Sequence, residues 1–586
     1  MVAVELDLTQ PERHRIGVVL RVQPRLRTMR LQLPGWTPGS YLIRDYVRQL
    51  EQLHVRQGDR LLDAHRSGPA CWQVQPDPDG PALEIGYAIH ATELSVRTCH
   101  LDQDHGFLAL AAVVLELEGE RWMPHRLRCR LPQGWEAFTP LPTDPQQAGC
   151  WLADDLDELL DSPLEAGPHS ETRFSVQGVP HRWVTWVDGD RQAPARTSDP
   201  IPPQLLADVE RVCQACCRLL GEERPAAPHY LFVLHLLDQG YGGLEHDNGC
   251  VLVYSRSQLH SADGYRKFLQ LVAHEYLHQW NVRRLRPREL APIDYHQAVA
   301  IPTLWFAEGV TSYVDQMLPL IAGLSTPEQL LEDLGSDLSR YRLTPGRSVQ
   351  SLRESSEEAW VKLYRADAYA PDSQISYYLK GAVLALCLDL HLRRQGSCLA
   401  TVLQRLWRSH GQCRRGYSEA DLIAAFAAEA PDLATQLPEW LQAVDDPDLD
   451  GYLRDVGLRL RPVEASHPWI GVGAALEGQQ LLARRVHRTG PAERAGLMVG
   501  DELLAIDGQR LREPAELAAG LRSGQSQQLL ISRRNRLRHL TVETQPPQVE
   551  RFALELDPAA TDQAVQNRQH WLALLPQPAP VALEVA

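Results

Sequence analysis

Apolar and polar side chains alternate through the first third of the chain. Three segments place an apolar residue at every second position: 16–22, 29–33 and 83–89. A period of two is typical of a β-strand with one buried face, because successive side chains of a strand point to opposite sides. We therefore expect a β-rich N-terminal domain over residues 1–190, ended by the Pro-rich segment 193–203.

The period changes after this segment. Apolar residues recur at helical spacing over 205–220, 261–280 and 303–320, with Ser261 or Asp263 as the N-cap of the second helix. Two short apolar runs between the first and second helices, 230–236 and 250–254, read as buried strands. Helices beside a small sheet predict an α+β domain over residues 204–320.

The rest of the chain divides into three parts. Residues 321–460 are predicted to be a helical domain, in which Thr326 to Gln329 form a capping box. Residues 466–547 have short apolar runs broken by Gly-Pro, Gly-Asp and Asp-Gly turns, which predicts a compact β module. A tail, 549–586, carries one more helix and a Pro-rich end. The fold class expected is multidomain α+β.

Composition narrows the function classes. The 586 residues exceed what a single hydrophobic core holds, so several domains are expected. The sequence has no run of about 18 consecutive apolar residues, so we expect no membrane-spanning helix. The formal net charge of −16 argues against nucleic-acid and anionic membrane partners. The chain starts without a secretory signal and has eleven Cys, which favours a reduced, cytoplasmic protein. Nothing in the pattern indicates an oligomeric state.

His274-Glu-Tyr-Leu-His278 is the sharpest chemical signal. On a helix the two histidines are i and i+4, so both imidazoles lie on one face and can share a tetrahedral ion. Glu275 lies about 100° round the helix, near the ion without binding it, where a base takes a proton from water. The alternative is two histidines and a glutamate on a solvated helix face.

Glu308 on the following helix is the candidate third ligand. A catalytic zinc site needs three protein ligands and keeps a further position open. Glu308 is flanked by Trp305, Phe306 and Val310, where a free carboxylate would be costly to bury. A cation would compensate that charge.

At this point the residues resemble a known family. HEYLHQWNVRRLRP followed by LWFAEGVTSY resembles the glycyl aminopeptidase family of zinc metallopeptidases, which belongs to the thermolysin-like clan. GWTPGSYLIRDY (35–46) resembles the N-terminal β-domain of that family. PWIGVG (468–473) and GPAERAGLMVGDELLAIDG (490–508) resemble its C-terminal PDZ domain. The resemblance covers nearly the whole chain and implies a thermolysin-like catalytic domain.

The resemblance also implies roles for individual residues. One Zn²⁺ per chain is expected on His274, His278 and Glu308, with Glu275 as general base and proton shuttle. Tyr241–His246 is similar to the Gly-x-Met-Glu-Asn motif of zinc aminopeptidases, although Leu244 and His246 replace Met and Asn. That similarity implies that Glu245 captures the α-ammonium of the substrate, with Gly242 and Gly243 beside it. The alternative is a Gly-rich turn with a surface Glu.

A second similarity concerns the oxyanion of the reaction. Ser376–Ala382 resembles the Tyr-x-Lys-Gly segment of the zinc aminopeptidases, in which a phenol stabilises the oxyanion. Spacing favours Tyr378, with Tyr377 as the alternative, and a plain core role for either remains open.

These expectations combine into one function. The chain is expected to be a zinc-dependent aminopeptidase that hydrolyses the N-terminal bond of peptides by Glu-assisted attack of zinc-bound water, favouring Gly or Ala. The alternatives are a zinc endopeptidase and a PDZ-based adaptor with a vestigial peptidase domain. The PDZ-like module would bind a peptide C-terminus or strand, or would pack on the catalytic domain.

Overall fold

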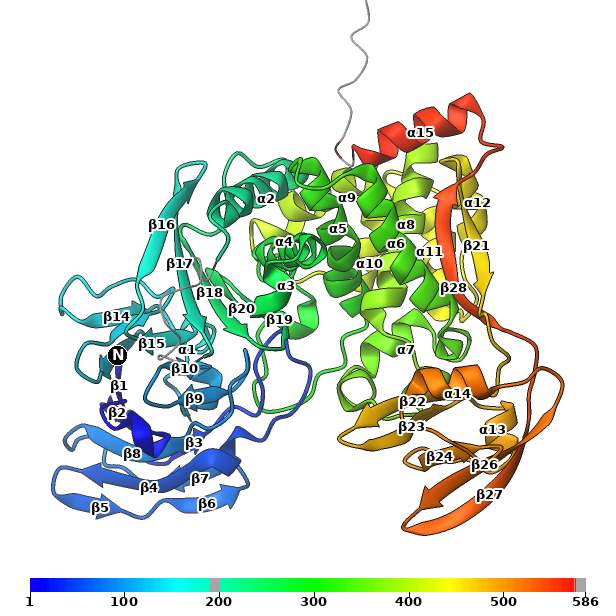
Figure 1. Cartoon of the computed structure of the whole chain (residues 1–586). Helices are drawn as coiled ribbons and strands as arrows, with labels where there is room; N and C mark the ends of the chain where they lie inside the picture. Colours follow the sequence, from blue (N-terminus) through cyan, green and yellow to red (C-terminus); the bar gives the residue numbers. More distant parts are fainter. Residues whose placement is uncertain (190–200, 574, 576–586) are drawn as a thin grey trace, which may run out of the picture.

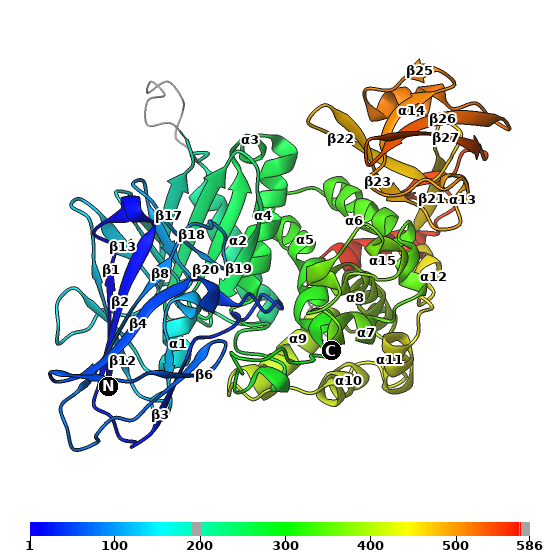
Figure 2. The same cartoon turned by 90° about the horizontal axis from the view of Figure 1, so that it is seen from below.

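The computed structural model describes residues 1–189, 201–573 and 575. Most of the Pro-rich segment 193–203 and of the Pro-rich end of the tail therefore lies outside the described residues. Figure 1 shows a β-rich lobe at the N-terminal side, a central group of helices, and a small β module beyond them. Figure 2 shows the same order from another side.

The N-terminal lobe contains three sheets. A seven-stranded sheet has the order β14 (Cys150–Ala153), β12 (His125–Arg130), β1 (Val2–Asp7), β2 (Arg15–Val22), β8 (Leu83–His90), β4 (Leu50–Gln57) and β5 (Arg60–Leu62). One four-stranded sheet has the order β13 (Glu136–Phe138), β15 (Leu164–Gly167), β10 (Gly106–Leu108) and β9 (Cys99–Leu101). The other has the order β11 (Glu116–Leu117), β3 (Met29–Gln32), β7 (Cys71–Val74) and β6 (His65–Gly68). The three segments with period two are all strands, as their pattern predicts.

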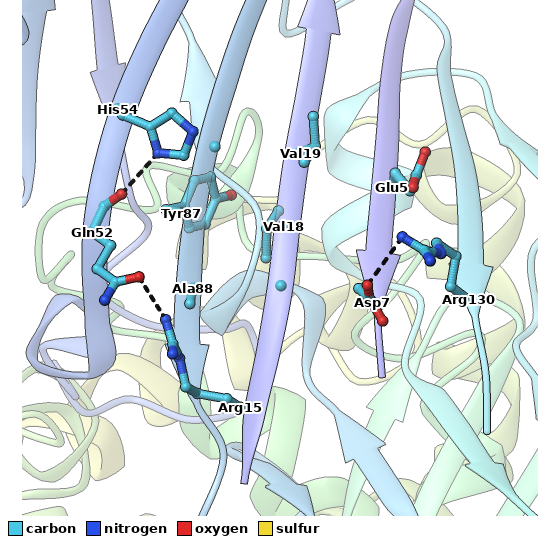
Figure 3. Close-up of a pocket in the computed structure, with 12 residues that line it drawn as sticks. Glu5, Asp7, Arg15, Val18, Val19, Gln52, His54, Tyr87, Ala88 and Arg130 are labelled. Carbon is cyan, nitrogen blue, oxygen red and sulfur yellow. Dashed lines mark hydrogen bonds and ion pairs between the residues drawn. The ribbon is translucent and has the colours of Figure 1, made fainter. Parts of the chain in front are cut away.

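One face of the seven-stranded sheet is apolar and the other carries polar side chains. Val2, Val4 and Leu6 of β1 are buried, and the residues between them face the opposite side. On that side is a shallow pocket in which Arg15 donates to Gln52, and Arg130 pairs with Asp7 (Figure 3). It shares no residue with the histidine motif.

The central sheet has five strands. Its order is β16 (Glu171–Val176), β17 (Val179–Val187), β18 (Tyr230–Leu237), β20 (Gly249–Ser255) and β19 (Tyr241–His246). β17, β18 and β20 are parallel, and β19 runs antiparallel to β20 at one edge. The hairpin β16–β17 falls within residues 1–190, yet it extends this sheet because β17 pairs with β18 along its length. The central sheet therefore contains strands from both the first predicted domain and the second.

The two faces of the central sheet pack against different layers. Tyr230 and Phe232 of β18 contact Tyr276 on α4 (Ala262–Leu277), and α2 (Leu205–Leu220) packs on α4. Leu231 and Val233, which point the other way, join an apolar cluster with Phe107 of the N-terminal lobe. The sheet is thus covered by helices on one face and by the sheet β13–β15–β10–β9 on the other.

Ser261 caps α4 by accepting a hydrogen bond from the backbone N–H of Gly264, as one of the two predicted N-caps.

The helical region follows the expected pattern. After a turn of π-helix, Trp305–Val310, come α5 (Thr311–Ile321), α6 (Pro327–Arg342), α7 (Leu352–Glu357), α8 (Tyr377–Arg394), α9 (Leu399–Leu406), α10 (Glu419–Ala427), α11 (Leu433–Gln442) and α12 (Leu449–Asp455). The capping box of α6 is present, with Thr326 and Gln329 bonded reciprocally. Within the described residues, one helix, 370–394, is long and apolar enough to span a membrane, but 89% of its apolar window is buried inside the fold. α8 is thus a core helix.

The small β module is inserted in the helical region rather than appended to it. Its sheet has the order β22 (Val472–Glu477), β23 (Gln480–Val486), β24 (Glu502–Ile506), β26 (Ser526–Arg533) and β27 (Arg536–Glu543), with the short helices α13 (Pro491–Arg494) and α14 (Pro514–Gly520). β21 (Leu458–Glu464) before it pairs with β28 (Val549–Leu556) after it. The tail then forms α15 (Asp562–Leu572), where Trp571 is fully buried and donates to Tyr313 of α5.

Candidate metal centre and substrate cleft

Two helical elements bring the candidate metal ligands together. His274 and His278 lie at the C-terminal end of α4, and Glu308 lies on the π-helix that precedes α5. The Nε2 atoms of His278 and His274 are 3.2 and 3.5 Å from Oε2 of Glu308. Two donors bound to one tetrahedral zinc at about 2.1 Å are about 3.4 Å apart, so the three side chains fit that ion.

Both imidazoles are held in the orientation that a metal ligand needs. Nδ1 of His274 donates to Asp315 at 2.8 Å, and Nδ1 of His278 donates to the backbone oxygen of Asn281 at 2.6 Å. These bonds leave the lone pair of each Nε2 facing Glu308, which is the usual arrangement of ligands with outer supporting contacts. Burial tends to raise the pKa of Glu308, but His278 and His274 outweigh it and hold that pKa below its usual range.

Glu275 is buried beside this cluster and keeps one free oxygen. Its Oε2 atom has no hydrogen-bond partner among the described residues. Burial raises the pKa of Glu275. The imidazoles of His274 and His278 oppose that rise, and the nearby carboxylates of Glu245 and Glu308 reinforce it. A carboxylate in such surroundings is a strong base next to the three ligands.

Strand β19 lies directly against Glu275. A Cβ atom on Gly243 would be 2.2 Å from Oε1 of Glu275, so only glycine lets the strand approach α4 this closely. Gly242 has φ +149°, a value that also favours glycine. The backbone conformation and packing of β19 thus explain why glycine occupies both positions. β19 forms the edge of its sheet, where an extended peptide could pair with it.

Glu245 of β19 lies beside Glu275 and His278. Its carboxylate, that of Glu275 and the ring of His278 offer donor atoms within 4.8 Å of one another. It is only 4% exposed, and Oε1 lacks a hydrogen-bond partner among the described residues. Glu245 is therefore not the surface side chain of a Gly-rich turn. Its free oxygen is available to a cationic group of a ligand.

A loop of the N-terminal lobe covers Glu245. A Cβ on Gly39 would lie 2.5 Å from Oε2 of Glu245, and Gly39 has φ +81°. Burial raises the pKa of Tyr41 on this loop, and the carboxylates of Glu308 and Glu245 raise it further. The loop is fixed by Trp36, whose Nε1 donates to the backbone of Asp294. The first domain thus packs directly against Glu245.

Three further tyrosines lie near His274, and one of them, Tyr364, also contacts Tyr41 of the covering loop, with 6.2 Å between ring centroids. The ring of Tyr378, at the start of α8, is 6.4 Å from that of His274, and its hydroxyl is 3.3 Å from that of Tyr364. Tyr377 is fully buried and stacks on Tyr378. Tyr378 is thus the phenol beside a candidate ligand, with Tyr364 next to it.

A close contact of two glycines sets the distance between Glu308 and these tyrosines. A Cβ on Gly309 would be 2.6 Å from Cα of Gly381, and a Cβ on Gly381 would be 2.9 Å from Cα of Gly309. α8 and the π-helix therefore touch backbone to backbone. The expected α-helix over 303–320 instead begins with this π-helical turn, a feature frequent at functional sites.

Sequence reasoning did not identify Tyr41, Tyr364 or Asp315. Asp315 is seven residues after Glu308, on the same face of the helix, so a helical wheel could have found it. Tyr41 lies in the segment 35–46 that resembles the family, but nothing in that resemblance placed it near Glu245, and Tyr364 carried no signal. Asn281 donates to the backbone of Phe306 and Ala307, which ties the end of α4 to the π-helix.

Family models match three parts of the chain. Residues 3–168 match the peptidase M61 N-terminal domain, residues 267–384 match the M61 glycyl aminopeptidase family, and residues 483–542 match a PDZ domain. No curated protein sequence matches the chain.

One solved structure shares the architecture of the whole chain. The crystal structure of an aminopeptidase N family protein from Idiomarina loihiensis is 29% identical, with a TM-score of 0.89 over 98% of this chain and 100% of that chain. An M1 zinc metallopeptidase from Deinococcus radiodurans is 16% identical, with a TM-score of 0.47 over 76% of this chain and 94% of that chain.

Proposed function

Because this chain belongs to the M61 glycyl aminopeptidase family of metallopeptidases, we propose that it removes small N-terminal residues, Gly or Ala, from peptides. The family implies zinc, and we assign one Zn²⁺ per chain to His274, His278 and Glu308. The observation that carries the proposal is the buried carboxylate of Glu245, which has a free oxygen near Glu275 and lies under the loop of Gly39.

The position of Glu245 favours an exopeptidase over an endopeptidase. A peptide that extended in both directions past the metal cluster would meet the loop of Gly39 and Tyr41. A free α-ammonium, in contrast, would pair with the carboxylate of Glu245, which is otherwise costly to bury. The first peptide carbonyl of such a substrate then lies next to the histidines.

Zinc at this site supplies Lewis acidity, which polarises a carbonyl and acidifies water. The protein groups do the rest. Glu275 takes a proton from water as the water oxygen bonds to the carbonyl carbon. The hydroxyl of Tyr378 donates a hydrogen bond to the developing oxyanion, with Tyr364 beside it. Glu275 then returns the proton to the leaving amine as the C–N bond breaks.

The test compares an alanyl peptide with its N-acetylated form, using wild type and the Glu245→Gln variant. We expect wild type to cleave the free peptide alone, and the variant to lose most of kcat/KM with zinc content unchanged. Equal cleavage of both peptides would contradict the role of Glu245 and favour an endopeptidase. Cleavage of neither by zinc-loaded protein would favour the adaptor function.

We also propose that the PDZ domain takes a peptide C-terminus or strand along β22. In its support, β22 lies at one edge of its sheet, next to α14. Arg485 of this domain pairs with Asp372, 3.4 Å away, so the module also contacts the helical region.

A reducing, cytoplasmic location is proposed because all eleven cysteines are free thiols.

A further inference from the structure

A second cluster, of two imidazoles and one carboxylate, shares no residue with the histidine motif. It comprises His105, which precedes β10, Glu165 of β15, and His235 of β18, and their donor atoms lie within 4.8 Å of one another. It sits where the sheet β13–β15–β10–β9 packs on the central sheet. None of its residues belongs to the proposed catalytic cluster of His274, His278 and Glu308.

The surroundings of Glu165 are apolar. It lies in one row across its sheet with Phe107 and Phe138, which are its partners on the two neighbouring strands. Both phenylalanines belong to the apolar cluster between the two sheets. On the facing strand β18, His235 follows Leu231 and Val233 of the same cluster at a spacing of two. The three donor residues are each fully buried.

A carboxylate buried in such a layer needs a cation or several donors to offset its charge. Two donors are present: Nε2 of His235 bonds Oε2 of Glu165 at 2.9 Å, and Nε2 of His169 bonds Oε1 at 2.9 Å. Bonds of this kind commonly orient a carboxylate or an imidazole that binds a metal.

Hydrogen bonds account for Glu165 but do not explain why the imidazole of His105 is buried here. Neither nitrogen of its ring has a hydrogen-bond partner among the described residues, and Nδ1 of His235 also lacks one. The ring of His105 is held by stacking on Trp186, 3.8 Å between centroids, and its edge faces His235. A buried, unpartnered imidazole costs free energy unless it binds something.

We propose that His105, Glu165 and His235 form a second site for a transition-metal dication, Zn²⁺ in the first instance. Two imidazoles and one carboxylate are the same donors as in the catalytic cluster, and they suit zinc. Binding replaces the 2.9 Å bond between His235 and Glu165 with two metal bonds, for which these atoms separate by about 0.5 Å.

The position of the site indicates a structural role. Its ligands come from both sheets that meet at this boundary, so the ion joins the N-terminal lobe to the central sheet. Asp102, whose side chain is partly exposed, lies next to the site, 4.0 Å from Nδ1 of His105.

The experiment measures metal by mass spectrometry after zinc loading and gel filtration. We expect two Zn²⁺ per wild-type chain and one in His105→Phe, which keeps the aromatic ring on Trp186, with peptide hydrolysis unchanged. Glu165→Gln should also hold one Zn²⁺. His125→Phe is the control, since His125 is a buried histidine of the same lobe that lies outside both clusters. One Zn²⁺ in wild type and in His105→Phe would overturn the proposal.

A second measurement does not depend on the folding of these variants. In the double variant His274→Ala/His278→Ala the catalytic ligands are gone, so bound Co²⁺ reports on the second site alone. We expect one Co²⁺ per chain with visible d–d absorption of a low-symmetry site. Absence of Co²⁺ binding by the folded double variant would overturn the proposal, whether or not the chain is a peptidase.

Discussion

Among single side chains, substitution of Glu275 is expected to lower the rate of the proposed reaction most. Glu275→Gln keeps the size of the side chain and removes the base, so kcat should fall by about 10²–10⁴. Zinc content should not change, because Glu275 is not among the three assigned ligands. Steady-state hydrolysis of an alanyl peptide, with metal analysis on the same sample, measures both. Glu332→Gln on α6 is a control, and full turnover of Glu275→Gln would contradict the proposed base.

His181 of β17 makes the stability of the central sheet depend on pH. Its Nδ1 donates to the backbone of Val179 and its Nε2 accepts from the hydroxyl of Tyr276, 2.9 Å away. Burial lowers the pKa of His181 to about 4, whereas the unfolded value is about 6.5. The unfolded chain therefore binds the proton more readily between these values, and stability falls as pH drops from about 6.5 to 4.

The predicted loss from this one histidine is at most about 3 kcal/mol over that interval. Urea unfolding of wild type and His181→Gln at pH 7 and pH 4.5 measures it. The variant should be less stable at pH 7 and should lose less on acidification. His90→Gln, at an exposed position, should behave as wild type. An equal acid-induced loss in wild type and His181→Gln would show that His181 is not the responsible group.

At the scale of elements, the contact between α8 and the π-helix determines the geometry of the site. The extra residue in the π-helical turn rotates the chain after Glu308 relative to an α-helix. Gly309 and Gly381 then let the two backbones touch. This contact joins the turn that carries Glu308 to the start of α8, which carries Tyr378.

Gly381→Ala should therefore disturb the site from outside it. The new methyl group would be 2.9 Å from Cα of Gly309 and from the backbone oxygen of Trp305. Overpacking of this kind costs about 1–3 kcal/mol. We expect a lower melting temperature together with weaker zinc retention against a chelator. Gly68→Ala is the control, because its methyl group meets only Cβ of Cys71, at an ordinary 3.5 Å. Unchanged zinc retention in Gly381→Ala would contradict the positioning role of the contact.

At the scale of the molecule, the PDZ domain is an insertion and the residues after it complete the helical region. β28 pairs with β21 and packs on α6, and Trp571 of α15 is buried against Tyr313. A chain ended after residue 460 would lose all of these contacts. We expect it to be strongly destabilised, for reasons unrelated to peptide binding.

Excision of the domain is the informative experiment. Glu464 and Val549 are partners across the β21–β28 pair, so a short Gly-Ser turn can join them in place of the module. We expect this variant to fold, to keep its zinc and to hydrolyse short peptides, with changes limited to long substrates. Thermal melts and assays of the excised and truncated chains separate the two effects. Loss of short-peptide hydrolysis in a folded, excised chain would make the PDZ domain part of the catalytic unit.

Local patterns in the sequence were sufficient for most elements and for the candidate ligands. The period-two runs, the capping box of α6 and the spacing of His274 and His278 depend on neighbours within one or two turns of chain. Such signals are encoded locally, since the backbone geometry of a strand or helix alone converts spacing into a shared face. Glu308 was identifiable because a carboxylate among large apolar residues needs compensation.

Only the tertiary structure decided how these pieces meet. The π-helical turn, the packing of the loop of Gly39 and Tyr41 against Glu245, and the place of Tyr364 all depend on contacts between distant segments. The same is true of the PDZ insertion and of the cluster of His105, Glu165 and His235, which three separate strands and turns assemble. Spacing along the chain carries no information on such contacts, because they arise from the packing of one face against another.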